Sequence, residues 1–262
     1  MQQNPPQLYV LAGSDADLDT ARQLATKLQT RVVTSPPPEL GGILVCINEG
    51  RIAAREHRDG SAWVSVEFTE GRNAHRQRFG GGINQHLCRA LGLNKQPRLQ
   101  IIDANGGFAR DAFVMASFGA QITLLEQSPL LCAMIEDALS RATATATADF
   151  ADIAARIRVV NTDSIDYLTT QAARCTDVIY LDPMFPERRK SAAVKKDMQL
   201  LHVLAGPDSS AEALLSLALS RARRRVVVKR PVHAAPLSAE RLTGDVRATH
   251  TRYDIYAPWP AD

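Results

Sequence analysis

The sequence lacks the features of a membrane-spanning, secreted or disulfide-bonded protein. No apolar run reaches the roughly 18 residues of a transmembrane helix. Residues 1–10 show no basic stretch followed by an apolar core, so we expect no secretory signal. The cysteines are widely separated and form no Cys-x-x-Cys pair; they are Cys46, Cys88, Cys132 and Cys175. We therefore expect free thiols, no metal site and a cytoplasmic protein that does not bind membranes.

Two phosphate-binding signatures are also missing. One glycine-bearing turn, at residues 104–111, follows an apolar strand, but Gly106 and Gly107 precede Ala109 where the dinucleotide fingerprint G-x-G-x-x-G needs other spacing. No Gly-Lys-Ser/Thr follows this turn, so the P-loop pattern also fails. The sequence therefore argues against a nicotinamide dehydrogenase. Alone, the turn is equally compatible with a plain strand–turn–helix connection.

Predicted strands and helices alternate from about residue 97 to the end, which we take as one domain, residues 97–262. The predicted strands are Leu99–Ala104, Ile122–Glu126, Ile157–Asn161, Asp177–Asp182, Arg225–Lys229 and Arg252–Ala257. The predicted helices are 111–118, 130–141, 164–173 and 210–222, with a flexible stretch at 142–148. Such alternation predicts a mostly parallel sheet covered by helices, an α/β fold.

The residues before this domain are predicted to form a small α/β lobe, residues 1–70, and a basic, glycine-rich linker with a helix, residues 71–96. In the lobe, strands are expected at 8–12, 43–48 and 63–68, and a helix at 15–30. The linker helix is expected at 83–91 and to end near Gly92. The lobe carries no chemical motif.

Three successive predicted strands of the main domain lead into an acidic residue: Asp103, Glu126 and Asp163. Ligands of open α/β sheets bind outside the carboxyl ends of the strands. A carboxylate in the position of Glu126 can accept hydrogen bonds from both hydroxyls of a ribose. Asp163 suits an adenine amino group and also suits an N-cap of the next helix, and both interpretations stay open. An acidic site favours a cationic sulfonium cofactor over an anionic phosphate, and it resembles the S-adenosylmethionine site of Rossmann-like methyltransferases.

The sharpest motif is Asp182-Pro-Met-Phe-Pro186, which directly follows an apolar strand. It resembles the D/N-P-P-Y/F motif of methyltransferases that act on exocyclic amines. The Asp182 carboxylate and the Pro183 carbonyl would accept hydrogen bonds from such an amine, orient its lone pair and favour its developing positive charge. Phe185 would stack on the base, worth about 1–3 kcal/mol. The structural alternative is an Asp-Pro turn with Phe185 in the core.

Basic residues follow this motif and recur in two other segments. Beside a base-binding motif they would contact phosphates, whereas a solvated helix face is the usual alternative. Residues 226–228 are expected in the core, which puts the next two residues at the carboxyl end of that strand. The candidate RNA-binding residues are Arg76, Arg78, Arg188, Arg189, Lys190, Lys195, Lys196, Lys229 and Arg230.

Several of these stretches, in the same order, resemble the RsmJ family of 16S ribosomal RNA guanine-N2 methyltransferases. The stretches are 75–82, 103–113, 180–196, 225–231 and 253–256, and the resemblance spans about residues 70–257. It implies an enzyme with a mostly parallel seven-stranded sheet, S-adenosylmethionine as cofactor, and 16S ribosomal RNA or the 30S subunit as partner. Gln127 and Ala109 depart from the family pattern, which has Arg and Gly there.

The resemblance also implies which residues bind the cofactor: Asp103, Gly107, Arg110, Asp111, Glu126, Gln127, Asp163, Ser164 and Asp182. Two other readings of the same motifs stay open. One is an amine methyltransferase for another ribosomal RNA base, DNA adenine or a protein glutamine. The other is a non-catalytic ribosome-binding protein with a vestigial cofactor fold.

Overall fold

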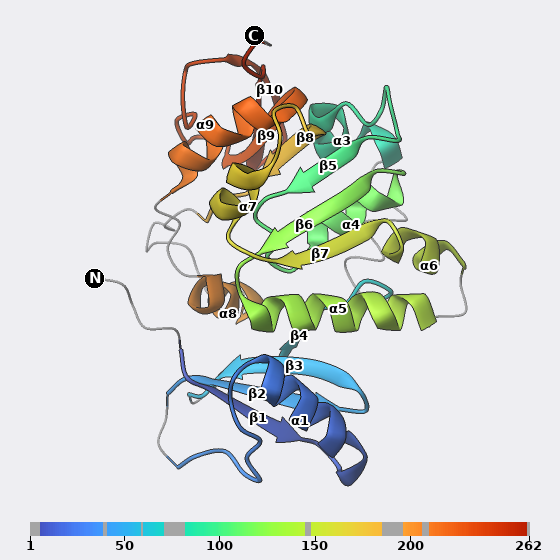
Figure 1. The fold of residues 1–262 in the computed structure, drawn as a ribbon, viewed down its shortest axis with the longest axis vertical. Coiled ribbons are helices and arrows are strands. Elements are labelled where there is room, and N and C mark those ends of the chain that lie inside the picture. Colours follow the sequence, from blue (N-terminus) through green and yellow to red (C-terminus); the bar gives the residue numbers. More distant parts are fainter. Residues whose placement is uncertain are drawn as a thin grey trace.

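We describe a computed structural model of the 262-residue chain. It describes residues 6–38, 41–58, 60–70, 82–144, 148–184, 196–205 and 210–260. The chain builds two separate sheets, and helices α5 and α8 lie between them (Figure 1). Among the described helices, none combines the length and apolar content needed to cross a bilayer.

The large sheet has the strand order β10-β11-β9-β8-β5-β6-β7. Its strands are β5 (Gln100–Asp103), β6 (Gln121–Glu126), β7 (Ile157–Asn161), β8 (Thr176–Leu181), β9 (Ala222–Pro231), β10 (Leu242–Arg247) and β11 (Thr251–Tyr256). Strands β5 to β9 are parallel, and the β10–β11 hairpin is antiparallel to them. This confirms the mostly parallel seven-stranded sheet. The strand order reverses between β5 and β8, where open α/β sheets bind their ligands.

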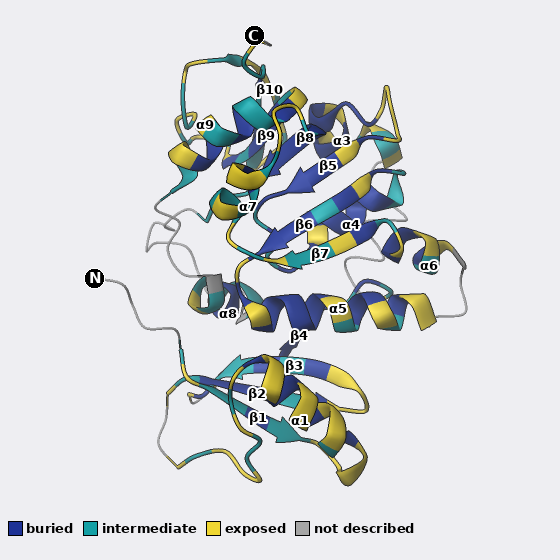
Figure 2. Cartoon of the chain, in the orientation of Figure 1, coloured by how far each residue is buried: buried dark blue, intermediate teal, exposed yellow. Residues whose placement is uncertain are grey.

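Helices cover both faces of the large sheet (Figure 2), and the central strand β8 is buried along its whole length. The helices of this part are α3 (His86–Leu91), α4 (Arg110–Ser117), α5 (Pro129–Ala144), α6 (Ala148–Ala154), α7 (Ser164–Thr170), α8 (Lys196–Ala205) and α9 (Ala211–Arg221). Successive strand residues alternate between two apolar clusters: Val178 packs with the cluster that includes α4 and α5, and Ile179 packs with that of α7 and α9. Residues 226–228 are fully buried, as predicted.

The small sheet, of order β1-β2-β3-β4, belongs to the N-terminal part of the chain. Its elements are β1 (Leu8–Ala12), a short 3-10 turn (Asp15–Asp17), α1 (Leu18–Lys27), β2 (Ile43–Asn48), β3 (Arg51–Glu56) and β4 (Val64–Ser65). The sequence did not predict β3. The sequence cue for this hairpin was Gly50. In the structure, Glu49 and Gly50 both have positive φ (51° and 73°), as tight hairpin turns require.

Other element predictions need correction. Residues 142–148 were expected to be flexible, but α5 continues to Ala144 because Ala142 is fully buried in the core, and α6 begins at Ala148; residues 145–147 lie outside the described residues. A strand over 63–68 was expected, yet only β4 pairs, because the Glu67 carboxylate accepts from the backbone amides of the next two residues and turns the chain. The predicted linker helix starts only at His86, and α7 ends at Thr170. Helix α8 and strand β10 were not predicted.

The two sheets are connected by contacts through α5. Arg141 on α5 donates to the Glu67 carboxylate at 2.6 Å and to the Val66 carbonyl at 2.7 Å, both in the small sheet's part of the chain. Asp137, one turn earlier on α5, accepts from Arg141 at 3.1 Å and from the backbone amide of Ile52 at 3.3 Å. The small sheet therefore sits on the outer face of a core helix of the large one (Figure 1).

Candidate functional site

A pocket of about 700 Å³ opens at the carboxyl ends of the central strands. Its lining includes all nine cofactor-binding candidates: Asp103, Gly107, Arg110, Asp111, Glu126, Gln127, Asp163, Ser164 and Asp182. They come from β5, β6, α4, α7 and the segment after β8. The reversal of strand order thus brings residues that are widely separated in sequence to one cavity, where the sequence predicted a ligand.

The glycine turn after β5 lines one side of the pocket. A Cβ on Gly106 would lie 2.6 Å from a methyl group of Leu124, so a larger residue would force the buried Leu124 side chain to shift. Gly107 has φ +52°, and Ala109, with φ +55°, adopts the same left-handed conformation immediately before α4. The turn also touches the segment after β8, because the Asn105 side-chain oxygen accepts from the backbone amide of Asp182 at 3.1 Å.

Glu126, at the end of β6, is buried and held from two sides. The backbone amide of Gly107 donates to one carboxylate oxygen at 2.9 Å, and that of Ser128 donates to the other at 2.8 Å. Burial raises the pKa of Glu126. Each oxygen keeps a second lone pair, so acceptance from a ribose stays a chemically consistent prediction.

The segment after β7 carries Asp163 and Ser164. Asp163 is the N-cap of α7, because its carboxylate accepts from the backbone amides of Ile165 at 2.8 Å and Asp166 at 3.1 Å. The Ser164 hydroxyl donates to the Ala104 carbonyl at 2.6 Å and connects this segment to the turn after β5. The capping interpretation of Asp163 is therefore correct, and contact with an adenine stays a prediction.

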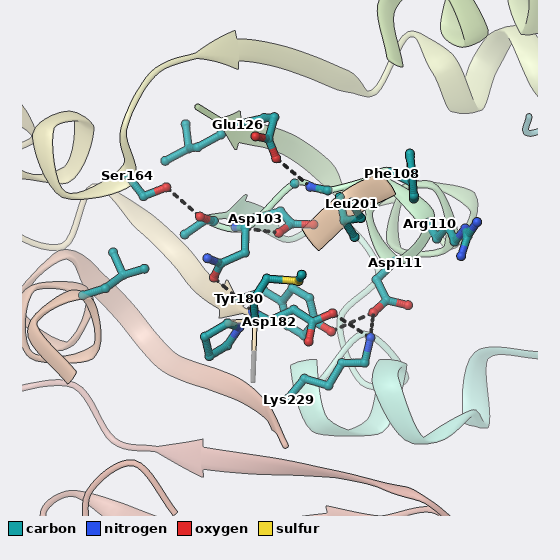
Figure 3. Close-up of a pocket in the computed structure, with 18 of the residues that line it drawn as sticks. Asp103, Phe108, Arg110, Asp111, Glu126, Ser164, Tyr180, Asp182, Leu201 and Lys229 are labelled. Atoms are coloured by element: carbon teal, nitrogen blue, oxygen red, sulfur yellow. Dashed lines mark hydrogen bonds and ion pairs between the residues drawn. The ribbon is translucent and has the colours of Figure 1, made fainter. Parts of the chain in front are cut away.

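Helix α8 supplies a wall of the pocket that the sequence did not predict. Met198, Leu201 and His202 line the cavity, and the Leu201 side chain lies opposite Gly107 (Figure 3). Asp197 on α8 pairs with Arg110 on α4 at 2.6 Å. The apolar spacing of Met198, Leu201 and the following leucine was the available signal, but the segment lies between stretches whose prolines and charges obscured it.

The pocket lining includes a lysine that contacts two carboxylates (Figure 3). Lys229 Nζ lies 2.8 Å from an Asp111 oxygen and 2.7 Å from an Asp182 oxygen. The Tyr180 hydroxyl donates to the same Asp111 oxygen at 2.8 Å. Burial opposes the charge of Lys229, but the two carboxylates outweigh it and raise its pKa.

Burial lowers the pKa of a lysine but raises the pKa of a carboxylic acid, and two neighbouring acids show this effect. Burial raises the pKa of Asp103 to about 8, while the backbone amide of Asn105 and the charge of Lys229 oppose the shift. Burial also raises the pKa of Asp182, against the lowering effect of Lys229. Perturbed acids that line one cavity are typical of functional sites.

The RNA-binding candidates divide into two groups. Lys229 and Arg230 lie at the carboxyl end of β9 and line the pocket, as predicted from the buried strand before them. Lys229 contacts carboxylates, and a guanidinium nitrogen of Arg230 donates to the Ala235 carbonyl. The others, with Phe185 of the predicted catalytic motif, lie outside the described residues: Arg76, Arg78, Phe185, Arg188, Arg189, Lys190, Lys195 and the side chain of Lys196.

Among the described residues, no three histidine, cysteine, aspartate or glutamate side chains are grouped to hold a metal ion. The described cysteines are free thiols.

Comparison with known proteins gives consistent matches over most of the chain. A family model described as "Putative SAM-dependent methyltransferase" matches residues 23–258. The chain is 41% identical to ribosomal RNA small subunit methyltransferase J of Laribacter hongkongensis over 96% of this chain and 87% of that protein. It is 40% identical to the protein of that name from Pseudomonas aeruginosa, over 96% of this chain and 95% of that protein. It is 49% identical to the protein of that name from Hydrogenovibrio crunogenus over a shorter stretch, which covers 74% of this chain and 70% of that protein.

One crystal structure matches along nearly the whole chain. It is a SAM-dependent methyltransferase from Neisseria gonorrhoeae, with a TM-score of 0.74 and 27% identity over 97% of each chain.

Proposed function

The chain belongs to the S-adenosylmethionine-dependent methyltransferases of the ribosomal RNA small subunit methyltransferase J family, and from this premise we propose that it methylates the exocyclic N2 amine of a guanine in 16S ribosomal RNA. The relatives' names supply the small-subunit RNA as substrate class. The observation that supports an amine acceptor is Asp182-Pro183 at the end of β8, in the cavity that holds the proposed cofactor residues.

The pocket has the chemistry that this cofactor needs. Its acidic lining suits a molecule with a sulfonium and an ammonium group. The turn at Gly106 and Gly107 presents bare backbone, and a side chain at Gly106 would collide with Leu124. When bound, S-adenosylmethionine supplies an electrophilic methyl group. We assign the ribose to Glu126 and Gln127, and the remaining contacts to Asp103, Gly107, Arg110, Asp111, Asp163, Ser164 and Asp182.

The residues after β8 would prepare the amine for attack. A guanine amine is a poor nucleophile, because its lone pair is delocalised into the ring. The Asp182 carboxylate and the Pro183 carbonyl accept its two N–H groups, which turns the lone pair towards the methyl donor and favours the positive charge that develops. Asp182, whose pKa burial raises, is also the acceptor for the proton that the methylated amine loses. Phe185 is proposed to stack on the base.

The remaining assignments follow from the RNA substrate. We propose that residues 97–262 form the catalytic domain, that residues 1–70 form an accessory lobe, and that the basic residues of 71–96 and 188–196 contact phosphates. The target base must be unpaired or flipped to reach a pocket at the strand ends. A 16S ribosomal RNA or 30S substrate places the enzyme in the cytoplasm.

The test is methyl transfer from radiolabelled S-adenosylmethionine to unmodified small-subunit RNA and to intact 30S subunits, followed by nucleoside analysis. We expect label in N2-methylguanosine. Cofactor binding without label on either substrate would overturn the RNA assignment in favour of a protein or DNA amine. Failure to bind the cofactor would leave a non-catalytic ribosome-binding protein.

A further inference from the structure

Lys229 sits beside Asp182 because of the register of two parallel strands. Leu181 of β8 pairs with Val228 of β9, and the next residue on each strand is Asp182 and Lys229 respectively. Their side chains meet with Nζ 2.7 Å from a carboxylate oxygen. The pairing is therefore built into the sheet and places a hydrogen-bond donor directly beside the acceptor that we assign to the target amine.

The ammonium group is held in a fixed position. Asp111, at the start of α4, also accepts a hydrogen bond from it, at 2.8 Å. Asp111 is itself fixed by the hydroxyl of Tyr180, a side chain that is 1% exposed. Two carboxylates on separate elements thus orient the lysine before any ligand arrives, which lowers the cost of using it for recognition.

Lys229 has a donor to spare on the pocket side. An ammonium carries three N–H groups, and its contacts within the described part of the chain are the two carboxylates of Asp111 and Asp182. Its side chain is 28% exposed and lines the pocket. Because two nearby negative charges already balance it, a phosphate gains little from this lysine. A neutral acceptor on a base gains a charge-assisted hydrogen bond.

The edge of guanine that carries the N2 amine has a matching order of groups. N2 and N1–H donate, and the carbonyl O6 next to them accepts. The two oxygens of Asp182 followed by Lys229 Nζ present acceptor, acceptor, donor, which is the row that cytosine presents to guanine in a base pair. We propose that Lys229 is a specificity-determining residue that donates to O6 of the target guanine while Asp182 accepts from N1–H and N2.

This assignment rests on the proposed function and explains how other amines would be rejected. In adenine and in cytosine, the ring nitrogen next to the amine is an acceptor, so it would place a lone pair against the Asp182 carboxylate. A site built to hydrogen-bond one edge rejects an edge that leaves its polar groups unpaired. Guanine alone among the four bases satisfies Asp182 and Lys229 together.

The experiment replaces O6 and Lys229 separately and together. An RNA that contains the methylation site carries either guanine or 6-thioguanine at the target; the latter keeps N1–H and N2 but offers sulfur, a weak acceptor, in place of O6. We expect kcat/KM of the wild-type enzyme to fall about 10- to 100-fold with 6-thioguanine, the scale of a hydrogen bond to a charged group. With guanine, kcat/KM of Lys229→Met should be lower than that of the wild type by a similar factor. With 6-thioguanine, the variant and the wild type should have nearly the same kcat/KM.

Several outcomes would overturn the proposal. Equal factors lost by Lys229→Met with both bases would show that the lysine acts only by supporting Asp182. Equal wild-type rates with guanine and 6-thioguanine would overturn it without any variant, so the test survives a Lys229→Met protein that fails to fold. Lys229→Arg, which keeps a donor, should retain most of the preference for guanine. No N2-methylguanosine from the wild-type enzyme with guanine would instead overturn the proposed function, and the role of Lys229 with it.

Discussion

Two regions of the molecule contain the same arrangement of charges, one cation between two carboxylates, with different surroundings. The lobe cluster consists of Arg141, Glu67 and Asp137, and it joins the small sheet to α5. The pocket cluster consists of Lys229, Asp111 and Asp182. Both bring together residues far apart in sequence, Glu67 with Arg141 and Asp111 with Lys229, at distances below 3 Å.

The clusters differ in how many hydrogen-bond partners the cation has within the described residues. Arg141 spreads its donors over Glu67, Asp137 and the Val66 carbonyl, in the planar geometry that suits a fixed structural contact. Burial opposes the charge of Glu67, but Thr69 and Arg141 donate to it and lower its pKa. In the pocket cluster, the pKa of Asp182 is raised by burial in spite of Lys229.

This contrast separates a contact that stabilises the fold from one kept ready for a substrate. In the lobe cluster the pKa of Glu67 is lowered because its own partners donate to it, so this carboxylate is satisfied without a ligand. A cluster that lines a cavity and holds an acid with a raised pKa has hydrogen-bonding capacity that only a ligand completes. Four predictions test this distinction, from the largest expected effect to the smallest.

Removing a carboxylate from each cluster should affect catalysis in only one case. We expect Asp182→Ala to lower kcat by about 100- to 1,000-fold, because the acceptor for the charged amine is lost. Asp137→Asn is the matched control from the lobe cluster, and its kcat should equal that of the wild type. Methyl transfer to RNA measures both. A full loss in both variants would show that the lobe cluster also shapes the active site.

Removing the cation of the lobe cluster should affect stability instead. We expect Arg141→Met to lower the free energy of unfolding by about 1–3 kcal/mol, because two partly buried carboxylates and the Val66 carbonyl each lose a hydrogen bond from the guanidinium. Urea denaturation measures the change, with Arg247→Met as control, since the Arg247 side chain is 62% exposed and its pair with Asp245 should contribute little. A denaturation midpoint shared by Arg141→Met and the wild type would refute the structural role.

Cofactor binding should release a proton from the pocket. With a pKa of about 8, Asp103 is mostly protonated at pH 7. A bound cation favours its charged form and lowers that pKa, so the proton leaves and affinity rises as the pH increases towards 8, by at most about tenfold per unit. Calorimetry at pH 7 in buffers of different ionisation enthalpy should detect release of about one proton. Asp103→Asn should abolish the buffer dependence, and equal enthalpies for the wild type would contradict the prediction.

The smallest effect is expected at another contact between the N-terminal lobe and α5, which is made by helix α1. Lys27 and Glu136 form an ion pair at 2.5 Å, but their side chains are 46% and 49% exposed. We expect Lys27→Ala to change the free energy of unfolding by less than about 1 kcal/mol, because water screens exposed pairs. The same urea experiment measures it. A loss as large as that of Arg141→Met would mean that exposure does not distinguish the contacts of this interface.

The sequence predicted most of the large sheet because its signals are local. An apolar run that ends in Asp-Pro identified β8 and Asp182, and Val226–Val228 identified the centre of β9. Glycines in a turn after β5 located the ligand end of the sheet. Prediction failed for β10, whose residues are mostly exposed and show little apolar pattern, and for α8, which lies in a charged and proline-containing stretch.

By itself, then, the sequence determined the alternation of elements and the acids at the strand ends, and it predicted a motif for binding an amine, because each of these depends on residues close together in the chain. Only the tertiary structure decided the partners of these residues. Lys229 after three buried valines has the same sequence pattern whether it faces phosphate, solvent or Asp182. Its role follows from the register between β8 and β9 and from the placement of Asp111 by α4, which are set by packing among segments up to 118 residues apart.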